Sequence, residues 1–215
     1  MCAFENPALK TFVAQLGDEQ VFGQVSIRRS GSEFELRHAS ERKAAAESLR
    51  GVAINELRSL AQFTAGGVFR PLKSAPDLAV GWRSVVPTEA ALETALNHLY
   101  PGALVDWLAT QSTPPPVTNY REFTQRQTGM YRIAHLLADA PAAQTIRATC
   151  APAGCLKRRL WSVTGLTPDT ATEKSVIPCL EPCAMLLEAA RKTVRAEQEA
   201  QRSSSTKLAN VPKSE

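Results

Sequence analysis

The chain has 215 residues, of which 44% are hydrophobic and 21% charged, enough for one large domain or two small ones. Its formal net charge of +4 is too small to indicate nucleic-acid binding by itself. The N-terminus has no basic and apolar leader, and no later segment approaches the ~18 uncharged apolar residues of a membrane span. We therefore expect a cytoplasmic protein without a membrane partner.

The first forty residues predict a helix followed by a β-hairpin. Asn6 and Pro7 suit the N-cap and first position of a short amphipathic helix that ends at Gly17. Hydrophobic residues then alternate with polar ones in residues 21–28 and again in 34–38. Two such segments joined by a short turn predict an antiparallel hairpin.

Three helical segments are predicted next. An apolar stripe predicts a longer helix from Glu41 to about Phe63, which should cover one face of the hairpin sheet. Thr88 suits the N-cap of another helix, which stops at Tyr100-Pro101, and residues 104–108 predict a further apolar turn or two.

Residues 112–117 read Ser-Thr-Pro-Pro-Pro-Val and mark the predicted domain boundary, because consecutive prolines favour an extended spacer. A helix is predicted over residues 120–137, where Gly129 indicates either a break or the close approach of another group. A final helix is predicted from the apolar residues Met185, Leu186, Ala189, Ala190 and Val194. We predict an α+β fold: an N-terminal domain with a small antiparallel sheet covered by helices (1–112), a mainly helical second domain (113–200) and a disordered tail (201–215).

Four of the five cysteines form two close pairs. Four residues separate Cys150 from Cys155, and three separate Cys179 from Cys183. Four thiolates suit a tetrahedral Zn²⁺ or a [4Fe-4S] cluster, and these gaps favour iron because structural zinc sites mostly use tighter two-residue gaps. Two disulfides or four unrelated buried thiols remain as alternatives, although a reducing compartment disfavours disulfides. Cys2 receives no role.

Basic charge accompanies these cysteines. Residues 117–168 contain seven basic and two acidic side chains, and residues 140–168 contain no acid. Pro182 and Cys183 are predicted in the first turn of the last helix, whose backbone N–H groups would favour a negatively charged metal centre. The basic side chains that we consider for an anionic ligand are Arg121, Arg126, Arg132, Lys157, Arg158 and Arg159.

Other reaction classes have weak support. The chain contains no phosphate-binding loop, dinucleotide fingerprint or nucleophile elbow, and its three histidines, His38, His98 and His135, are isolated. We assign no catalytic residue.

Several short runs together resemble a known family. They are Arg70-Pro71-Leu72-Lys73, Ala75-Pro76, Gly81-Trp82, Tyr100-Pro101 with Ala103-Leu104 and Trp107, Arg121-Glu122 with residues 126–132, Cys155-Leu156-Lys157 and Leu160-Trp161. In these runs the chain is similar to the C-terminal half of multidomain CbiX-type proteins. There a sirohydrochlorin chelatase-like region is followed by a stabilising α/β domain and a [4Fe-4S]-binding domain.

The resemblance implies that Cys150, Cys155, Cys179 and Cys183 hold a [4Fe-4S] cluster. It also implies an accessory redox or tuning module for cobalamin or sirohaem synthesis that lacks its own chelatase site and is not an enzyme by itself. The implied partners are a chelatase subunit, an acidic electron donor or the polyacidic tetrapyrrole, which the basic side chains would bind. The alternative is a zinc-stabilised binding module whose basic surface meets nucleic acid.

Overall fold

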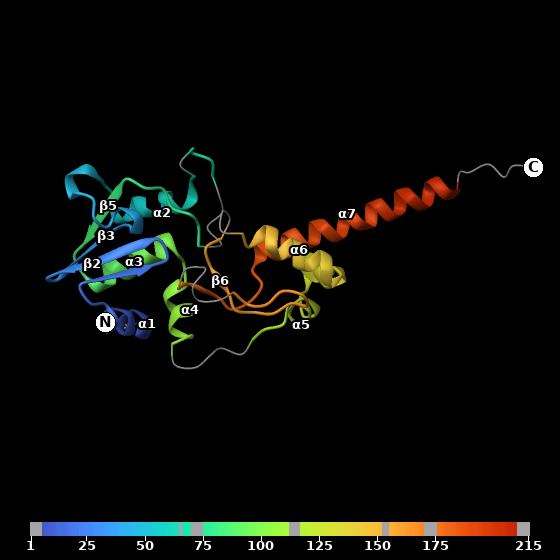
Figure 1. The fold of residues 1–215 in the computed structure, drawn as a ribbon, viewed down its shortest axis with the longest axis horizontal. Coiled ribbons are helices and arrows are strands. Elements are labelled where there is room, and N and C mark those ends of the chain that lie inside the picture. Colours follow the sequence, from blue (N-terminus) through green and yellow to red (C-terminus); the bar gives the residue numbers. More distant parts are fainter. Residues whose placement is uncertain are drawn as a thin grey trace, which may run out of the picture. The chain divides into compact units, whose positions relative to one another are not determined.

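The structure is a computed structural model that describes residues 6–64, 66–69, 75–111, 117–151, 155–169 and 176–209, with side chains up to residue 203. Its fold class is α+β, as predicted (Figure 1). The chain divides into two compact units. Unit 1 comprises Met1–Val117, Cys150–Leu160 and Pro168–Leu180, and unit 2 comprises Thr118–Thr149, Trp161–Thr167 and Glu181–Glu215.

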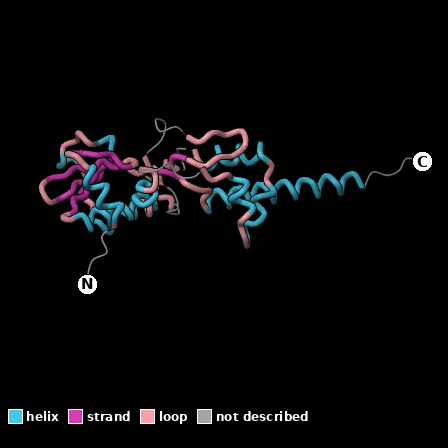
Figure 2. The backbone as a smooth tube through the Cα atoms, turned by 90° about the horizontal axis from the view of Figure 1, so that it is seen from below, coloured by secondary structure: helices cyan, strands magenta, loops and turns pink. Residues whose placement is uncertain are grey.

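Unit 1 is built on a five-stranded sheet in the order β1-β2-β3-β5-β4 (magenta in Figure 2). The strands are β1 (Glu19–Phe22), β2 (Val25–Ser30), β3 (Glu33–His38), β4 (Arg50–Gly51) and β5 (Trp82–Val86). All neighbours are antiparallel except β4 and β5, which are parallel. The predicted hairpin is confirmed as β2–β3. Residues 21 and 22 instead belong to β1, because the chain turns at Gly23 with a φ of 63°.

In its described part, unit 1 contains the α-helices α1 (Pro7–Gln15), α2 (Ile54–Gln62), α3 (Glu89–Leu99) and α4 (Ala103–Leu108). Short 3₁₀ turns lie at Ala39–Glu41 and Ala46–Ser48. The predicted caps are confirmed, since the Asn6 side chain accepts a hydrogen bond from the Ala8 N–H at 2.9 Å and Thr88 accepts one from the Ala91 N–H at 3.2 Å. Such caps satisfy N–H groups that a helix leaves without internal partners.

The helix predicted from Glu41 to Phe63 is wrong in its first half. Arg50 and Gly51 form β4 beside β5, and the Val52 N–H donates to the Arg83 carbonyl at 2.8 Å. The helix begins only at Ile54, where the Glu56 carboxylate accepts a hydrogen bond from the Ala53 N–H at 2.9 Å. A pairing with a strand some thirty residues later thus overrides the local helical pattern.

The core of unit 1 lies on one face of the sheet. Phe12 of α1 meets Phe22 of β1 and Trp107 of α4 edge to face, with ring centroids 5.4 and 5.5 Å apart. Leu57, Leu92 and Leu96 from the helices are also fully buried in this cluster. Because strand side chains alternate, the opposite face carries charged residues of β2, β3 and β5.

Segments from the second half of the chain complete unit 1. Arg158–Arg159 (β6) and Pro178–Cys179 (β7) form a parallel two-stranded ladder. The Leu156 N–H donates to the Ala75 carbonyl at 2.8 Å, and Ile177 is fully buried in the core of unit 1. Two of the cysteine-bearing segments are therefore anchored to the N-terminal fold.

Unit 2 is helical: α5 (Tyr120–Gln125), a 3₁₀ segment η3 (Gly129–Leu136), α6 (Asp139–Thr149) and α7 (Ala184–Ala209). The helix predicted over residues 120–137 is interrupted, because α5 ends at Gln125 and η3 begins at Gly129, which has a φ of 60°. A Cβ at this residue would meet no atom of the described residues within 4 Å. Gly129 therefore marks a break and not a close approach. Helix α6 was not predicted.

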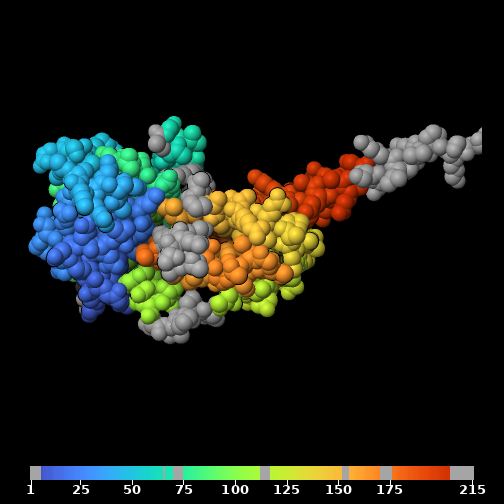
Figure 3. All heavy atoms as spheres, in the orientation of Figure 1, coloured from blue at the N-terminus to red at the C-terminus, as the bar shows by residue number. Residues whose placement is uncertain are grey.

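Helix α7 packs against α6 and η3, and its last turns extend beyond them (red in Figure 3). It continues to Ala209, past residue 200, near which the tail was predicted to begin. Within the described residues, no helix combines the length and the apolar character that a membrane crossing needs.

Candidate metal centre

The four paired cysteines lie at the ends of regular elements. Cys150 directly follows α6, and the Cys155 N–H donates to the Ala151 carbonyl at 2.9 Å. Cys179 ends β7, where its carbonyl accepts a hydrogen bond from the Leu160 N–H at 3.0 Å. All four, including Cys183, are partly exposed, and none forms a disulfide. Cys2 lies outside the described residues.

The cysteines are divided between the two units. Cys150, Cys155 and Cys179 belong to unit 1, whereas Cys183 belongs to unit 2. Among the described residues, no group of three or more metal-ligating side chains converges on one point. The connecting residues 152–154 and 170–175 are not among those described.

Arg159 supplies positive charge beside two of the cysteines. It lies in β6 and is only 2% exposed. Burial lowers the pKa of Arg159 from its ordinary value, while the charges of Asp169, Cys150 and Cys179 act in the opposite direction. Because a buried charge is costly unless it is paired, a guanidinium here favours negative charge on its neighbours.

Asp169 holds Arg159 in place. Its carboxylate accepts a hydrogen bond from the Arg159 backbone N–H at 2.8 Å, and a guanidinium nitrogen lies 3.8 Å from the other carboxylate oxygen. Sequence reasoning did not single out Asp169. The available signal was its position as the first acidic residue after the acid-free run of residues 140–168.

Cys183 lies at the N-terminus of α7. The helix begins at Ala184, so Pro182 and Cys183 precede it and are not in its first turn as predicted. The Cys183 carbonyl accepts a hydrogen bond from the Leu187 N–H at 3.0 Å, as an N-cap residue does. The positive end of the helix dipole favours an anionic sulfur at this position.

The donor set and its charges fit an anionic thiolate-bound centre. Four cysteines supply the sulfur ligands that a [4Fe-4S] cluster or a Zn²⁺ ion takes. The buried guanidinium of Arg159 and the N-terminus of α7 each stabilise negative charge beside members of this set.

Three of the six basic side chains predicted to bind an anion are engaged within the fold. Arg121 pairs with Asp139 and donates to the His135 and Leu137 carbonyls at 3.1 and 3.2 Å. Lys157 pairs with Asp106 at 3.2 Å, and Arg159 is buried beside Asp169.

The other three predicted basic side chains are Arg126, Arg132 and Arg158. Arg126 and Arg132 are exposed in unit 2 and form no ion pair with any described residue. Arg158 in unit 1 is partly exposed, and its Nε is buried without a hydrogen-bond partner among the described residues.

Comparisons with known proteins divide the chain into two matched regions. Residues 8–111 match a family model described as the DR2241 stabilising domain, and residues 112–192 match one described as a 4Fe-4S iron-sulfur cluster binding domain. All four paired cysteines fall in the second region. None of the curated proteins compared matches the chain.

A solved structure resembles both regions together. It is DR2241 from Deinococcus radiodurans, described as a multi-domain protein with structural similarity to chelatases and with two additional novel domains. The TM-score is 0.73 at 27% sequence identity, and the match covers 88% of this chain. The chain spans 41% of the length of that protein.

Proposed function

We propose that this chain binds a [4Fe-4S] cluster through Cys150, Cys155, Cys179 and Cys183. The observation that carries the proposal is the match of residues 112–192 to a 4Fe-4S cluster binding domain that contains these four cysteines. When bound, such a cluster supplies reversible one-electron transfer or a structural crosslink.

The chain's own residues would hold and tune the cluster. Arg159 lies beside Cys150 and Cys179 and offsets part of the negative charge of a thiolate-ligated cluster. The backbone N–H groups at the start of α7 would do the same near Cys183.

For the biological role, we propose an accessory redox or tuning module in a chelatase-like system. The chelatase similarity described for DR2241 supports this class of system. The resemblance to CbiX-type proteins supports sirohydrochlorin as the substrate of that system. The proposed role is therefore in cobalamin or sirohaem synthesis in the cytoplasm. Metal insertion is assigned to a chelatase region or subunit, and this chain by itself is not expected to catalyse it.

Anaerobic purification followed by iron, acid-labile sulfide and zinc analysis tests the cofactor. We expect about four iron and four sulfide per chain, as the cluster stoichiometry requires. A colourless protein with one zinc and no sulfide would overturn the cluster proposal and support the alternative, a zinc-stabilised module with a nucleic-acid-facing surface.

Single Cys→Ser variants test the ligand assignment. Cys150→Ser and Cys183→Ser should each lower cluster content, because each removes one thiolate ligand. Cys2→Ser is the matched control and should leave the content unchanged. Loss of the cluster only in the control would refute the assignment.

The exposed Arg126 and Arg132 are the proposed contacts for a polyacidic partner, either the tetrapyrrole or an acidic electron donor. Changing both to Gln should weaken sirohydrochlorin binding or slow reduction by an acidic donor while cluster content stays the same. The control changes exposed Arg50 and Arg58 of unit 1 to Gln, which removes the same charge elsewhere. Unchanged binding with lower cluster content would show that Arg126 and Arg132 only support the cluster.

A further inference from the structure

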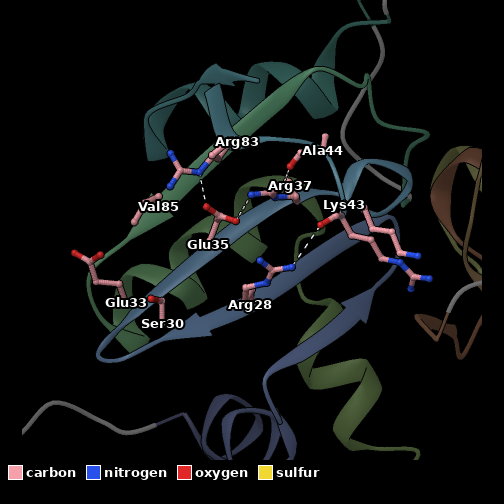
Figure 4. A pocket seen from close by; sticks show the side chains of 11 residues that line it. Arg28, Ser30, Glu33, Glu35, Arg37, Lys43, Ala44, Arg83 and Val85 are labelled. Atoms are coloured by element: carbon pink, nitrogen blue, oxygen red, sulfur yellow. Dashed lines mark hydrogen bonds and ion pairs between the residues drawn. The ribbon is translucent and has the colours of Figure 1, made fainter. Parts of the chain in front are cut away.

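The polar face of the sheet in unit 1 contains a hollow of about 400 Å³ (Figure 4). It lies over β2, β3 and β5 and is bordered by the segment that follows β3. Its lining residues are Arg28, Ser30, Glu33, Glu35, Arg37, Arg42, Lys43, Ala44, Ala46, Arg83 and Val85. None of the paired cysteines is among them.

The lining is polar and positively charged. Five of its side chains are basic and two are acidic, whereas only Ala44, Ala46 and Val85 are apolar. Pockets for neutral organic ligands are lined mainly by apolar and aromatic side chains, so this composition favours a charged ligand. The excess of basic groups makes that ligand an anion.

The floor of the hollow is an ordered ion-pair network. Glu35 lies between Arg37 and Arg83 and pairs with both. Arg37 is only 5% exposed and also donates to the Ala44 carbonyl at 2.7 Å, so its position is fixed by the fold. Figure 4 shows Glu35 directed toward both guanidinium groups.

The strand register places like charges together in this floor. Arg37 of β3 is the direct neighbour of Arg83 of β5. Like charges directly opposite each other in a sheet are destabilising. A single carboxylate, Glu35, bridges the two cations, so one positive charge remains uncompensated within this trio.

The rim of the hollow adds cations that form no ion pair within the described part of the fold. Arg42 and Lys43 are exposed, and neither forms an ion pair with any residue in the described part of the chain. Arg28 lies 3.6 Å from Glu19 and donates to the Arg42 carbonyl at 3.5 Å, a contact that ties β2 to the rim.

We propose that this hollow binds a small organic or inorganic anion with two or more phosphate or carboxylate groups. Guanidinium groups held in fixed positions form charge-assisted, often paired hydrogen bonds with both groups. The volume lies within the ~300–1,000 Å³ of small-ligand sites. The lining includes neither the paired cysteines nor Arg126 and Arg132, so the proposal goes beyond the proposed cluster function.

Isothermal titration of the full-length protein with inorganic pyrophosphate and with citrate tests the site. We expect saturable binding that weakens as salt rises, because the contacts are ionic. Tighter binding of pyrophosphate identifies a phosphate ligand, and tighter binding of citrate identifies a carboxylate ligand. Either preference supports the site. No saturable binding of either probe up to about 1 mM would overturn the proposal.

The variant Arg42→Gln/Lys43→Gln should weaken binding about tenfold, which corresponds to ~1.4 kcal/mol. Both side chains are exposed, so the fold should be retained, as circular dichroism can verify. The matched control, Arg50→Gln/Arg58→Gln, removes the same charge from the same unit outside the hollow and should change binding less than about twofold. Equal weakening in both variants would show a diffuse charge effect and refute a defined site. The single change Lys43→Glu provides an independent check, and unchanged binding in it would also count against the site.

Discussion

Replacing Arg159 by Gln is expected to destabilise unit 1 and to alter the metal centre. The Arg159 side chain is 3% exposed and that of Asp169 is 19% exposed, so the pair is largely removed from water. Removing one partner of a buried pair typically costs ~3–5 kcal/mol. Asp169 retains its hydrogen bond from the residue 159 backbone N–H at 2.8 Å and some solvent contact, so we expect the lower end, about 3 kcal/mol.

Urea unfolding of the anaerobically purified variant measures the loss of stability, with Arg126→Gln as the control. Arg126 is exposed and has no described ion-pair partner, so its change should cost less than about 0.5 kcal/mol. Arg159→Lys should recover part of the loss, because it restores the charge without the planar fork.

The reduction potential of the bound cluster provides a second readout. Loss of a positive charge beside Cys150 and Cys179 should make the cluster harder to reduce. Each ~1.4 kcal/mol by which the reduced cluster is destabilised relative to the oxidised one lowers its one-electron reduction potential by about 59 mV. A loss of stability below about 1 kcal/mol together with an unchanged potential would refute the assigned role of Arg159.

Two further predictions concern unit 1. Gly23 and Gly31 both have a φ near +60°, but a Cβ at Gly23 would lie 2.7 Å from the Tyr100 ring, whereas one at Gly31 meets no described atom within 4 Å. Thermal unfolding should therefore show a loss of about 1–2 kcal/mol for Gly31→Ala and a larger one for Gly23→Ala, and equal losses would contradict the tight contact. Burial acts to raise the pKa of Glu35, but hydrogen bonds from Arg83 and Arg37 outweigh it and hold the pKa below 4.5. The stabilisation by ionised Glu35 is thus present above pH 4.5 and is lost as the pH falls through the lowered pKa. The free energy of unfolding, measured with urea, should therefore fall more steeply on acidification in the wild type than in Glu35→Gln.

The elements that the sequence predicted correctly are those determined by local interactions. Asn6 and Thr88 cap their helices through neighbours two or three residues away, and the β2–β3 hairpin follows from alternation around one turn. The errors have non-local causes. Residues 50 and 51 leave the predicted helix because they pair with β5, a strand that the local pattern did not reveal.

In the candidate site, too, the features that depend on local sequence could be predicted and those that depend on distant contacts could not. Cysteine spacing along the chain was enough to nominate four ligands, and the matched iron-sulfur domain contains all of them. The partners of the basic residues could not be predicted in the same way. The contacts of Lys157 with Asp106 and of Arg121 with Asp139 join residues 51 and 18 positions apart.

The number of charges along the sequence and their arrangement in the fold therefore indicate different anion-binding surfaces. Acidic and basic side chains are nearly balanced in number over residues 1–112, yet the sheet places an excess of cations around one hollow. In the basic run of residues 117–168, by contrast, several cations are already paired within the fold. Mutations at sites that share no partner usually have nearly additive effects. Because the Arg126/Arg132 and Arg42/Lys43 pairs belong to different units and share no described partner, loss of one anion-binding property should leave the other intact.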